Sequence, residues 1–288
     1  MLVEARTTEN GAAGAAHGTE PWTGQGRAPA LRLEGVSKSF DLRGGERLEV
    51  LRGIDLNVAH GGIAALLGRS GCGKSTLLHI VAGLTEQDSG EVWIEGKPAS
   101  TFRESGSVGY MFQDDRLLPW RTALNNVALS LEPGNMGRRA RLDRAREMLE
   151  MVGLAGFENA YPNELSGGMR SRVALARSLA PRPGILLMDE PFSRLDAQTR
   201  SAMHAELVRL RDLLGMTVLF VTHDIEEAAV LAEQVTVLAP RPGRIVERFD
   251  LDRSPPPRDG TSPEAVETAR ALKAALGEPP AESDGAGH

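Results

Sequence analysis

The sequence predicts an α/β protein built on a parallel β-sheet, with an antiparallel β portion near its N-terminus. Two observations carry this prediction. Short aliphatic and β-branched runs alternate with segments of helical periodicity, which is typical of βαβ units. The runs at 185–189 and 217–221 are apolar except for Asp189 and Thr217 at their ends, as in strands that helices cover on both faces. We therefore expect helices on both sides of the sheet.

The predicted elements follow one another along residues 30–254. Strands are expected where four to eight aliphatic or β-branched residues stand between turn residues, at 31–36, 54–58, 62–67, 91–95, 108–112, 185–189, 217–221, 234–238 and 244–248. Helices are expected where apolar residues recur every three to four positions, at 74–83, 138–152, 167–180, 197–214 and 224–232.

The two ends of the chain differ from this body. Residues 1–29 are rich in Gly, Ala and Thr and have few bulky apolar side chains, so a disordered extension is predicted. Residues 255–288 are predicted to be a flexible tail after the prolines of 254–257. Within the tail, Ser262-Pro263 predicts the start of a short helix over 263–276, with one face made by Val266, Ala269, Leu272 and Leu276. The sequence leaves open whether this helix docks on the body or lies in solvent.

Composition excludes several classes of function. Of the 288 residues 41% are hydrophobic, yet no run of 18 apolar residues occurs, so no membrane span is predicted. No signal peptide is recognised, which makes the cytosol the expected compartment. The single Cys excludes an intramolecular disulfide and a Cys-based metal cluster. The net charge is −6, of which residues 30–250 carry −2, so the body has no basic field for nucleic acid.

A glycine-rich motif predicts a nucleotide site. Gly68-Arg-Ser-Gly-Cys-Gly-Lys-Ser75 fits G-x-x-x-x-G-K-[ST] and lies between a predicted strand and a predicted helix. Such a loop turns backbone N–H groups and a helix N-terminus toward phosphates. We expect Lys74 to reach the β- and γ-phosphates, Ser75 to ligate Mg²⁺ and Thr76 to contact the α-phosphate. The predicted nucleotide-binding residues here are Gly68, Arg69, Ser70, Gly71, Cys72, Gly73, Lys74, Ser75 and Thr76.

Two adjacent acids end the apolar strand 185–189. Ligands of parallel sheets bind at the carboxyl ends of the strands, so Asp189 is predicted to hold Mg²⁺ through water. Glu190, one residue further, is predicted to polarise the water that attacks the γ-phosphate. Acids at strand ends are often merely solvated, and only the phosphate loop makes the functional interpretation strong.

Three further features narrow the prediction. Leu165-Ser-Gly-Gly-Met169 precedes a predicted helix, Gln113 follows the strand 108–112, and His223 follows the strand 217–221. In this order, the chain resembles the ATP-binding subunit of ABC transporters over about residues 31–249. The resemblance implies a P-loop NTPase core with a parallel sheet, an N-terminal antiparallel β subdomain and a helical signature subdomain at about 114–180.

The resemblance also implies roles for individual residues and the cofactors ATP and Mg²⁺. Residues 165–169 match the ABC signature, whose Ser166, Gly167 and Gly168 would cap the nucleotide of a second copy. The other matched residues are Gln113 of the Q-loop, which would touch Mg²⁺ or the attacking water, Asp196 of the D-loop 193–196, the switch histidine His223, and Phe40, which would stack on adenine.

The same resemblance implies partners. Two copies would pair head to tail and drive a transmembrane permease dimer on separate chains, with a periplasmic or lipid-anchored substrate-binding protein acting indirectly. The subunit would lie peripherally at the cytoplasmic face of the inner membrane, and no nucleic acid is expected. The segments 112–120, 187–192, 195–200 and 238–244 are similar to the nitrate, aliphatic sulfonate and taurine importers, with sulfonate the leading cargo.

Two other classes compete with the importer. A soluble ABC ATPase of DNA repair or translation is disfavoured because only 52 residues separate Gln113 from the signature, and because the body is not basic. A P-loop kinase or GTPase is disfavoured by the signature and His223. Two residues depart from the family pattern: Met169, where Gln is commoner, and Arg194, where a small residue is usual.

Two hypotheses concern residues beside these motifs. Positive charge near Cys72 is expected to favour its thiolate, so that alkylation would block ATP binding by bulk. The segment 117–120 is expected either to lie in the core of the helical lobe or to shape the groove that accepts a permease helix.

Overall fold

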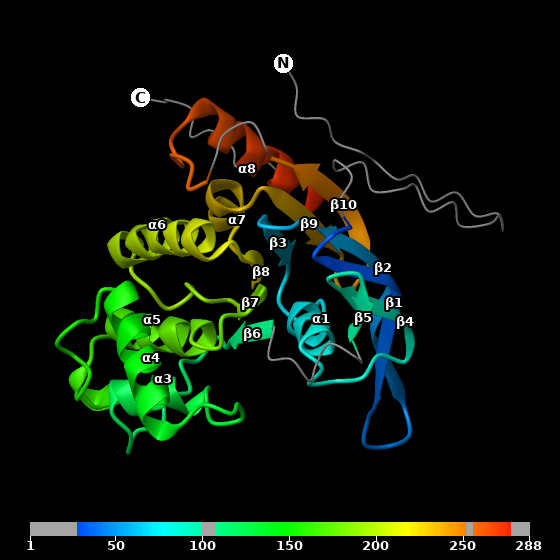
Figure 1. The fold of residues 1–288 in the computed structure, drawn as a ribbon. Coiled ribbons are helices and arrows are strands. Elements are labelled where there is room, and N and C mark those ends of the chain that lie inside the picture. Colours follow the sequence, from blue (N-terminus) through cyan, green and yellow to red (C-terminus); the bar gives the residue numbers. More distant parts are fainter. Residues whose placement is uncertain (1–27, 100–107, 252–255, 278–288) are drawn as a thin grey trace, which may run out of the picture.

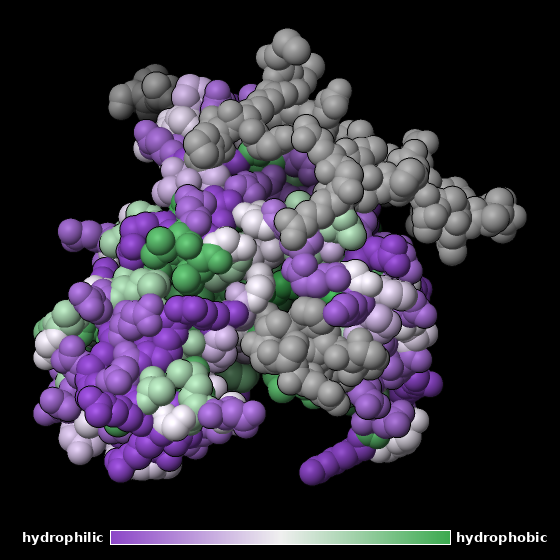
Figure 2. All heavy atoms as spheres, in the orientation of Figure 1, coloured by the Kyte–Doolittle hydropathy of each residue, from purple (hydrophilic) through white to green (hydrophobic). Residues whose placement is uncertain are grey.

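The computed structural model describes residues 28–99, 108–251 and 256–277, and consists of two sheets and a layer of helices (Figure 1). The predicted extension lies almost wholly outside the described residues. Among the described residues no helix has the length and apolar character needed to cross a bilayer. On the face in Figure 2, apolar side chains form small separate patches among hydrophilic ones.

The main sheet has six strands in the order β10-β9-β3-β8-β7-β6, which confirms the predicted α/β class. Neighbouring strands run parallel except for β10, which is antiparallel to β9. The phosphate-loop strand lies in the middle, where both neighbours hydrogen-bond to it. The strands are β3 (Ile63–Gly68), β6 (Val108–Met111), β7 (Ile185–Asp189), β8 (Thr217–Thr222), β9 (Gln234–Leu238) and β10 (Ile245–Asp250).

The second sheet is antiparallel, in the order β2-β1-β4-β5, as the sequence predicts for the N-terminal portion. Its strands are β1 (Leu31–Asp41), β2 (Arg47–Val58), β4 (Ser89–Ile94) and β5 (Lys97–Pro98). The predicted strands 31–36 and 54–58 cover only parts of β1 and β2. Both strands continue as a hairpin in which polar residues outnumber apolar ones, so the buried Val50 and Leu51 do not form a recognisable apolar run.

Seven α-helices surround the main sheet in the described chain. They are α1 (Lys74–Val81), α3 (Ala123–Leu129), α4 (Arg138–Met151), α5 (Gly167–Leu179), α6 (Ala197–Leu214), α7 (Ile225–Leu231) and α8 (Pro263–Ala275). Helix α3 is absent from the sequence prediction, since its consecutive Asn125 and Asn126 are weak helix formers in a helix of only two turns. Thr122 caps α3, since its hydroxyl accepts from the Asn125 N–H at 3.3 Å.

Two apolar cores lie on opposite faces of the main sheet. Alternate residues of β3 divide between them, with Ile63, Ala65 and Leu67 in one core and Ala64 and Leu66 in the other. The first core joins the sheet to α3–α7. The second encloses α1 between the two sheets, so α1 and the loop before it are held from both sides.

Helix α8 packs on α7, which settles the alternative left open for the tail helix (Figure 1). Ala265, Thr268 and Leu272 are buried, whereas Val266 is 39% exposed. The predicted face is therefore wrong at Val266, where the neighbouring Ala265 is buried instead, and right at Leu272, with Ala269 and Leu276 partly buried. Residues 256–277 are accordingly not a free tail.

Candidate functional site

The predicted site residues gather at one edge of the main sheet. In the parallel strands β3, β8, β7 and β6, Leu67 pairs with Thr222, Asp189 with Val221, and Met111 with Met188. The carboxyl ends of these strands therefore lie level. The phosphate loop, His223, the Asp189–Glu190 pair and Gln113 each follow one of these ends, where ligands of such sheets bind.

The phosphate loop has a conformation that requires glycine. Gly71 and Gly73 have φ of 79° and 100°, and a Cβ on Gly73 would lie 2.7 Å from Leu51 Cδ2. Gly73 is also the N-cap of α1 and supplies no side-chain acceptor. The first N–H groups of α1 are thus left for a ligand, and the helix dipole favours an anion there.

Lys74 is drawn back over this loop. Its Nζ donates to the carbonyl oxygens of Gly68 at 2.7 Å and Arg69 at 3.3 Å, and the residue is 5% exposed. Backbone carbonyls satisfy the donors of a buried ammonium but do not neutralise its charge. The arrangement therefore suits exchange of these carbonyls for phosphate oxygens.

Ser75 and Asp189 form the part of the site that fits a metal ion. The Ser75 hydroxyl donates to Asp189 Oδ1 at 2.9 Å, and the Tyr110 hydroxyl donates to Oδ2 at 3.4 Å. Burial raises the pKa of Asp189 above its usual range, and the Ser75 hydrogen bond opposes this only in part. A hydroxyl and a carboxylate that converge in this way are the hard oxygen donors that Mg²⁺ prefers.

Of the three residues predicted to be catalytic, Gln113 and His223 both contact the third, Glu190. Gln113 Nε2 donates to Glu190 Oε2 at 3.0 Å, and His223 Nδ1 lies 3.3 Å from Glu190 Oε1. Glu190 has a φ of 43°, and its N–H donates to the Val221 carbonyl at 3.0 Å. This left-handed residue interrupts the strand alternation, so Glu190 departs from the direction of β7 directly after Asp189.

The signature lies on the helical layer at the start of α5. Ser166 is the N-cap, and its hydroxyl accepts from the Met169 N–H at 3.3 Å. Ser166, Gly167 and Gly168 share a pocket of about 400 Å³ with Asp196 of the D-loop. A Cβ on Gly168 would lie 2.8 Å from Thr199 Cγ2, so this glycine permits the close approach of α5 and α6. The bare backbone donors expected of the signature therefore open into a pocket.

Asp196 also has a structural role. Its Oδ1 accepts from the Thr199 N–H at 2.9 Å and its Oδ2 from the Thr199 hydroxyl at 2.7 Å, which lowers the pKa of Asp196. The predicted D-loop aspartate is thus the N-cap of α6.

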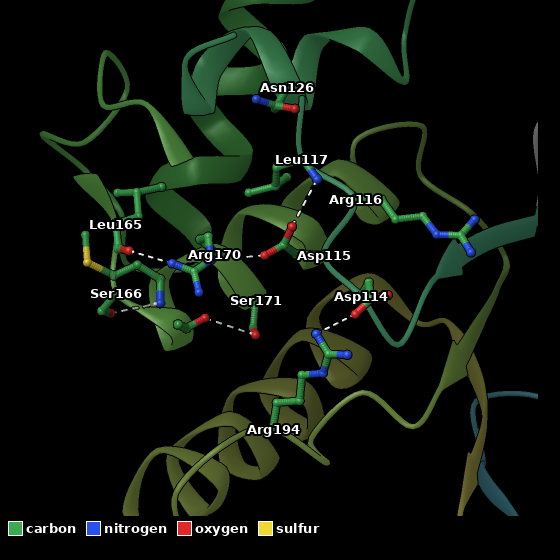
Figure 3. A network of polar contacts seen from close by, with 12 residues as sticks. Asp114, Asp115, Arg116, Leu117, Asn126, Leu165, Ser166, Arg170, Ser171 and Arg194 are labelled. Carbon is green, nitrogen blue, oxygen red and sulfur yellow. Dashed lines mark hydrogen bonds and ion pairs between the residues drawn. The ribbon is translucent and has the colours of Figure 1, made fainter. Parts of the chain in front are cut away.

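Charged residues that the sequence prediction missed tie the Q-loop to the signature helix (Figure 3). Arg170 Nε donates to Asp115 Oδ2 at 3.1 Å, and its Nη1 donates to the Leu165 carbonyl at 2.9 Å. Asp115 Oδ1 accepts from the Leu117 N–H at 3.1 Å. On a helix such arginines are indistinguishable from a solvated face, so no sequence signal identifies them.

The unusual D-loop residue has a partner in the same network. Arg194 Nη1 lies 2.5 Å from Asp114 Oδ1, next to the Q-loop glutamine (Figure 3). Met169, the other departure, keeps its backbone position in the α5 cap and packs partly against the main core. Neither departure removes a backbone donor of the signature.

Two further residues predicted at the nucleotide site are Phe40, expected to stack on adenine, and Cys72, inside the phosphate loop. Phe40 is on the hairpin extension of β1, 40% exposed, with Lys38 Nζ 5.3 Å from the ring centroid. Its ring is accessible for stacking.

Cys72 is 1% exposed, and burial raises the pKa of its thiol although Lys74 acts in the opposite direction. The predicted thiolate is therefore wrong, because desolvation outweighs the nearby positive charge.

Comparisons with known proteins agree with this geometry. Residues 51–193 match the ABC transporter family. The uncharacterized ABC transporter ATP-binding protein MJ0412 of Methanocaldococcus jannaschii is 45% identical over 239 residues, which cover 82% of this chain and 87% of the relative. The taurine import ATP-binding protein TauB of Rhizobium johnstonii is 46% identical over 222 residues, which cover 77% of this chain and 84% of the relative.

Solved structures give the same result for the fold. The dimeric ATP-binding cassette MJ0796, in a post-hydrolysis state bound to ADP and Pi, is similar with a TM-score of 0.69 and 35% identity. It covers 78% of this chain and is itself covered completely. The cbiO1 protein of Clostridium perfringens, part of the ABC transporter complex cbiONQ, has a TM-score of 0.69 and 27% identity, and the match covers 78% of this chain and 89% of cbiO1. Sequence and fold together therefore confirm the resemblance, and this chain belongs to the ATP-binding proteins of the ABC transporter family.

Proposed function

We propose that this protein is the ATP-hydrolysing motor subunit of an importer for aliphatic sulfonates, with taurine or nitrate as the alternative cargoes. The observation that carries the proposal is the convergence of Gln113 and His223 on Glu190, next to the Ser75–Asp189 pair and below the phosphate loop. Such a site has a general base, a metal position and a phosphate cradle within one sheet edge.

The residues divide the work of hydrolysis. Lys74 exchanges its carbonyl partners for phosphate oxygens. Ser75, Asp189 and Gln113 would hold Mg²⁺, which would neutralise phosphate charge. Glu190 accepts a proton from the attacking water. Water oxygen bonds to the γ-phosphorus as the bond to the ADP oxygen breaks, which gives ADP and phosphate.

A second copy of the chain completes the nucleotide site in this proposal. The pocket at Ser166–Gly168 lies on the helical layer and presents a second set of backbone donors, which one γ-phosphate does not need within one subunit. The solved relative MJ0796 is dimeric. Two copies paired head to tail would each cap the nucleotide in the phosphate loop of the other, and Asp196 and Phe40 would border the same nucleotides.

The segment after the Q-loop is proposed to receive the permease. Leu117 is buried, but Trp120 is 71% exposed, so the alternative that this tryptophan belongs to the core is wrong. Buried Asn126 fixes the loop, because its Oδ1 accepts from the Leu118 N–H at 2.7 Å and its Nδ2 donates to the Arg121 carbonyl at 2.9 Å. A large apolar side chain that stands in solvent on such a hydrogen-bonded loop is suited to a partner surface.

The relatives support an importer over a soluble ABC ATPase of repair or translation. Taurine, the cargo in the name of the Rhizobium relative, is a sulfonate, in line with the leading cargo. In this proposal the subunit lies peripherally at the cytoplasmic face of the inner membrane, on a permease dimer served by a periplasmic or lipid-anchored binding protein.

Two measurements test the proposal. Lys74→Ala should abolish ATP binding in titration calorimetry, and unchanged affinity would contradict the phosphate-loop assignment. A strain that lacks this gene should lose growth on an alkanesulfonate as sole sulfur source and regain it with the wild-type gene but not with Lys74→Ala. Normal growth on sulfonates with loss of nitrate uptake would assign the cargo to nitrate.

A further inference from the structure

The loop between β9 and β10, residues 239–244, packs on the outer side of the phosphate loop. Arg241 Nε donates to the Gly71 carbonyl at 2.9 Å across 170 positions of sequence. The Arg241 Nη2 atom lies 3.2 Å from the point where a Cβ on Gly71 would stand. One edge of the guanidinium therefore lies directly against the backbone of the loop, although Arg241 is an exposed residue.

The same loop is fixed to the antiparallel sheet. The Gly243 N–H donates to the Val50 carbonyl at 2.8 Å, and the Arg52 N–H donates to the Gly243 carbonyl at 2.9 Å. A Cβ on Gly243 would lie 2.1 Å from the Cys72 carbonyl oxygen. Backbone contact on this scale is possible only with glycine, so β2, the 239–244 loop and the phosphate loop form one packed unit.

Arg241 restrains part of the phosphate loop that would otherwise be conformationally free because of its glycines. Gly71 and Gly73 both have positive φ, and glycine adopts many other conformations at little cost. The peptide between Gly71 and Cys72 is held at both ends, since the Gly71 oxygen accepts from Arg241 and the Cys72 N–H donates to the Arg69 carbonyl at 3.3 Å. Loss of the Arg241 contact would leave this peptide held only by the longer hydrogen bond from Cys72 to Arg69.

We propose that Arg241 is a positioning residue for nucleotide binding, acting from outside the phosphate loop. It holds the Gly71 peptide in the orientation that binds phosphate and places one further positive charge behind the loop. This inference rests on the proposed role of the phosphate loop. The ligand is a nucleoside polyphosphate, and Arg241 acts on it through Gly71 without touching it.

The test compares Arg241→Ala, Arg241→Lys and Arg244→Ala in the full chain. Arg244 is an exposed arginine of the same loop, so Arg244→Ala removes the same charge without the Gly71 contact. Affinities for Mg·ATP and Mg·ADP are measured with a fluorescent nucleotide analogue, together with kcat, the KM for ATP and the Tm. Lys74→Ala is measured alongside.

Arg241→Ala should raise the Kd for both nucleotides about tenfold and raise KM more than it lowers kcat. Arg241→Lys should recover part of the affinity because its ammonium can reach the same carbonyl, and Arg244→Ala should bind like the wild type. Equal effects in Arg241→Ala and Arg244→Ala would reduce the role to general charge and overturn the inference. A lowered Tm with unchanged Kd would make Arg241 merely structural, again against the inference. If Lys74→Ala also retains affinity, the phosphate-loop assignment itself fails.

Discussion

Gln113 and Glu190 lie at the ends of neighbouring parallel strands, and the Gln113 amide donates to the Glu190 carboxylate at 3.0 Å. His223, after the strand on the other side, lies 3.3 Å from the second carboxylate oxygen. One acid therefore has a polar side chain at each oxygen. The carboxylate that we propose as general base is thus held on both sides, which is the preorganisation that proton abstraction requires.

The first prediction concerns this base. Glu190→Gln keeps the size of the side chain but cannot accept a proton from water, so turnover should fall by roughly 10²–10⁴-fold. ATP binding should persist, and the variant should accumulate as an ATP-stabilised dimer in gel filtration. Turnover within tenfold of wild type would remove Glu190 from the role of base.

The second prediction separates stability from activity at Asp189. Burial raises the pKa of this carboxyl, so folding favours its protonated form and the ionised form costs stability above that pKa. Asp189→Asn should raise the Tm by about 2–4 °C at pH 8 and abolish Mg²⁺-dependent turnover. Because the wild-type carboxyl regains its proton as pH falls, the gain should shrink toward pH 4. A gain that is independent of pH would show that desolvation is not its cause.

The third prediction concerns Trp120. Because the side chain is 71% exposed, Trp120→Ala should leave the Tm within about 1 °C of wild type and most of the basal ATPase intact. Transport in reconstituted vesicles with permease and binding protein should fall at least tenfold. The control is Phe157→Ala, which alters another exposed aromatic side chain, 45% accessible, outside the Q-loop segment. If both variants transport equally well, Trp120 has no coupling role.

The fourth prediction concerns Cys72. The thiol is buried and its pKa is raised, so iodoacetamide should leave the native protein unmodified at pH 7.5 while labelling it fully in denaturant. Mass spectrometry counts the label. Rapid labelling in native buffer would restore the expectation of a reactive thiolate.

The fifth prediction concerns helix α8. Leu272 is fully buried, so Leu272→Ala should lower the free energy of unfolding by about 2–5 kcal/mol. Val266→Ala, on the 39% exposed side of the same helix, should cost less than about 1 kcal/mol. Urea denaturation gives both values. Equal losses at the two positions would place α8 differently from the packing described.

The position of the site can be predicted from the sequence alone, because each strand of a parallel sheet is recognisable as a short apolar run. Asp189, Glu190, Gln113 and His223 each follow an apolar run, and a parallel sheet brings the ends of such runs to one edge whatever their separation. The phosphate loop 68–75 is recognisable from its glycine-rich motif. The convergence of these residues was therefore predictable before their distances were known.

Other features depend on tertiary contacts that leave no local pattern. Cys72 has charged neighbours in sequence, yet its burial decides its pKa. Trp120 is an apolar residue that lies outside the core, and Arg241 is an ordinary loop arginine until the fold brings it to Gly71. In each case the property of the residue depends on burial or on a contact with a distant part of the chain, and neither can be read from the neighbouring sequence.

The ion pair between Arg194 and Asp114 has an evolutionary consequence. Its two members stand 80 positions apart in the sequence, and both side chains are more than half exposed. A lineage in which position 194 returns to a small side chain loses the partner of Asp114, so selection on that acid relaxes at the same time. Among relatives of this chain, positions 114 and 194 should therefore change together, whereas Asp196 beside them should change independently of position 114.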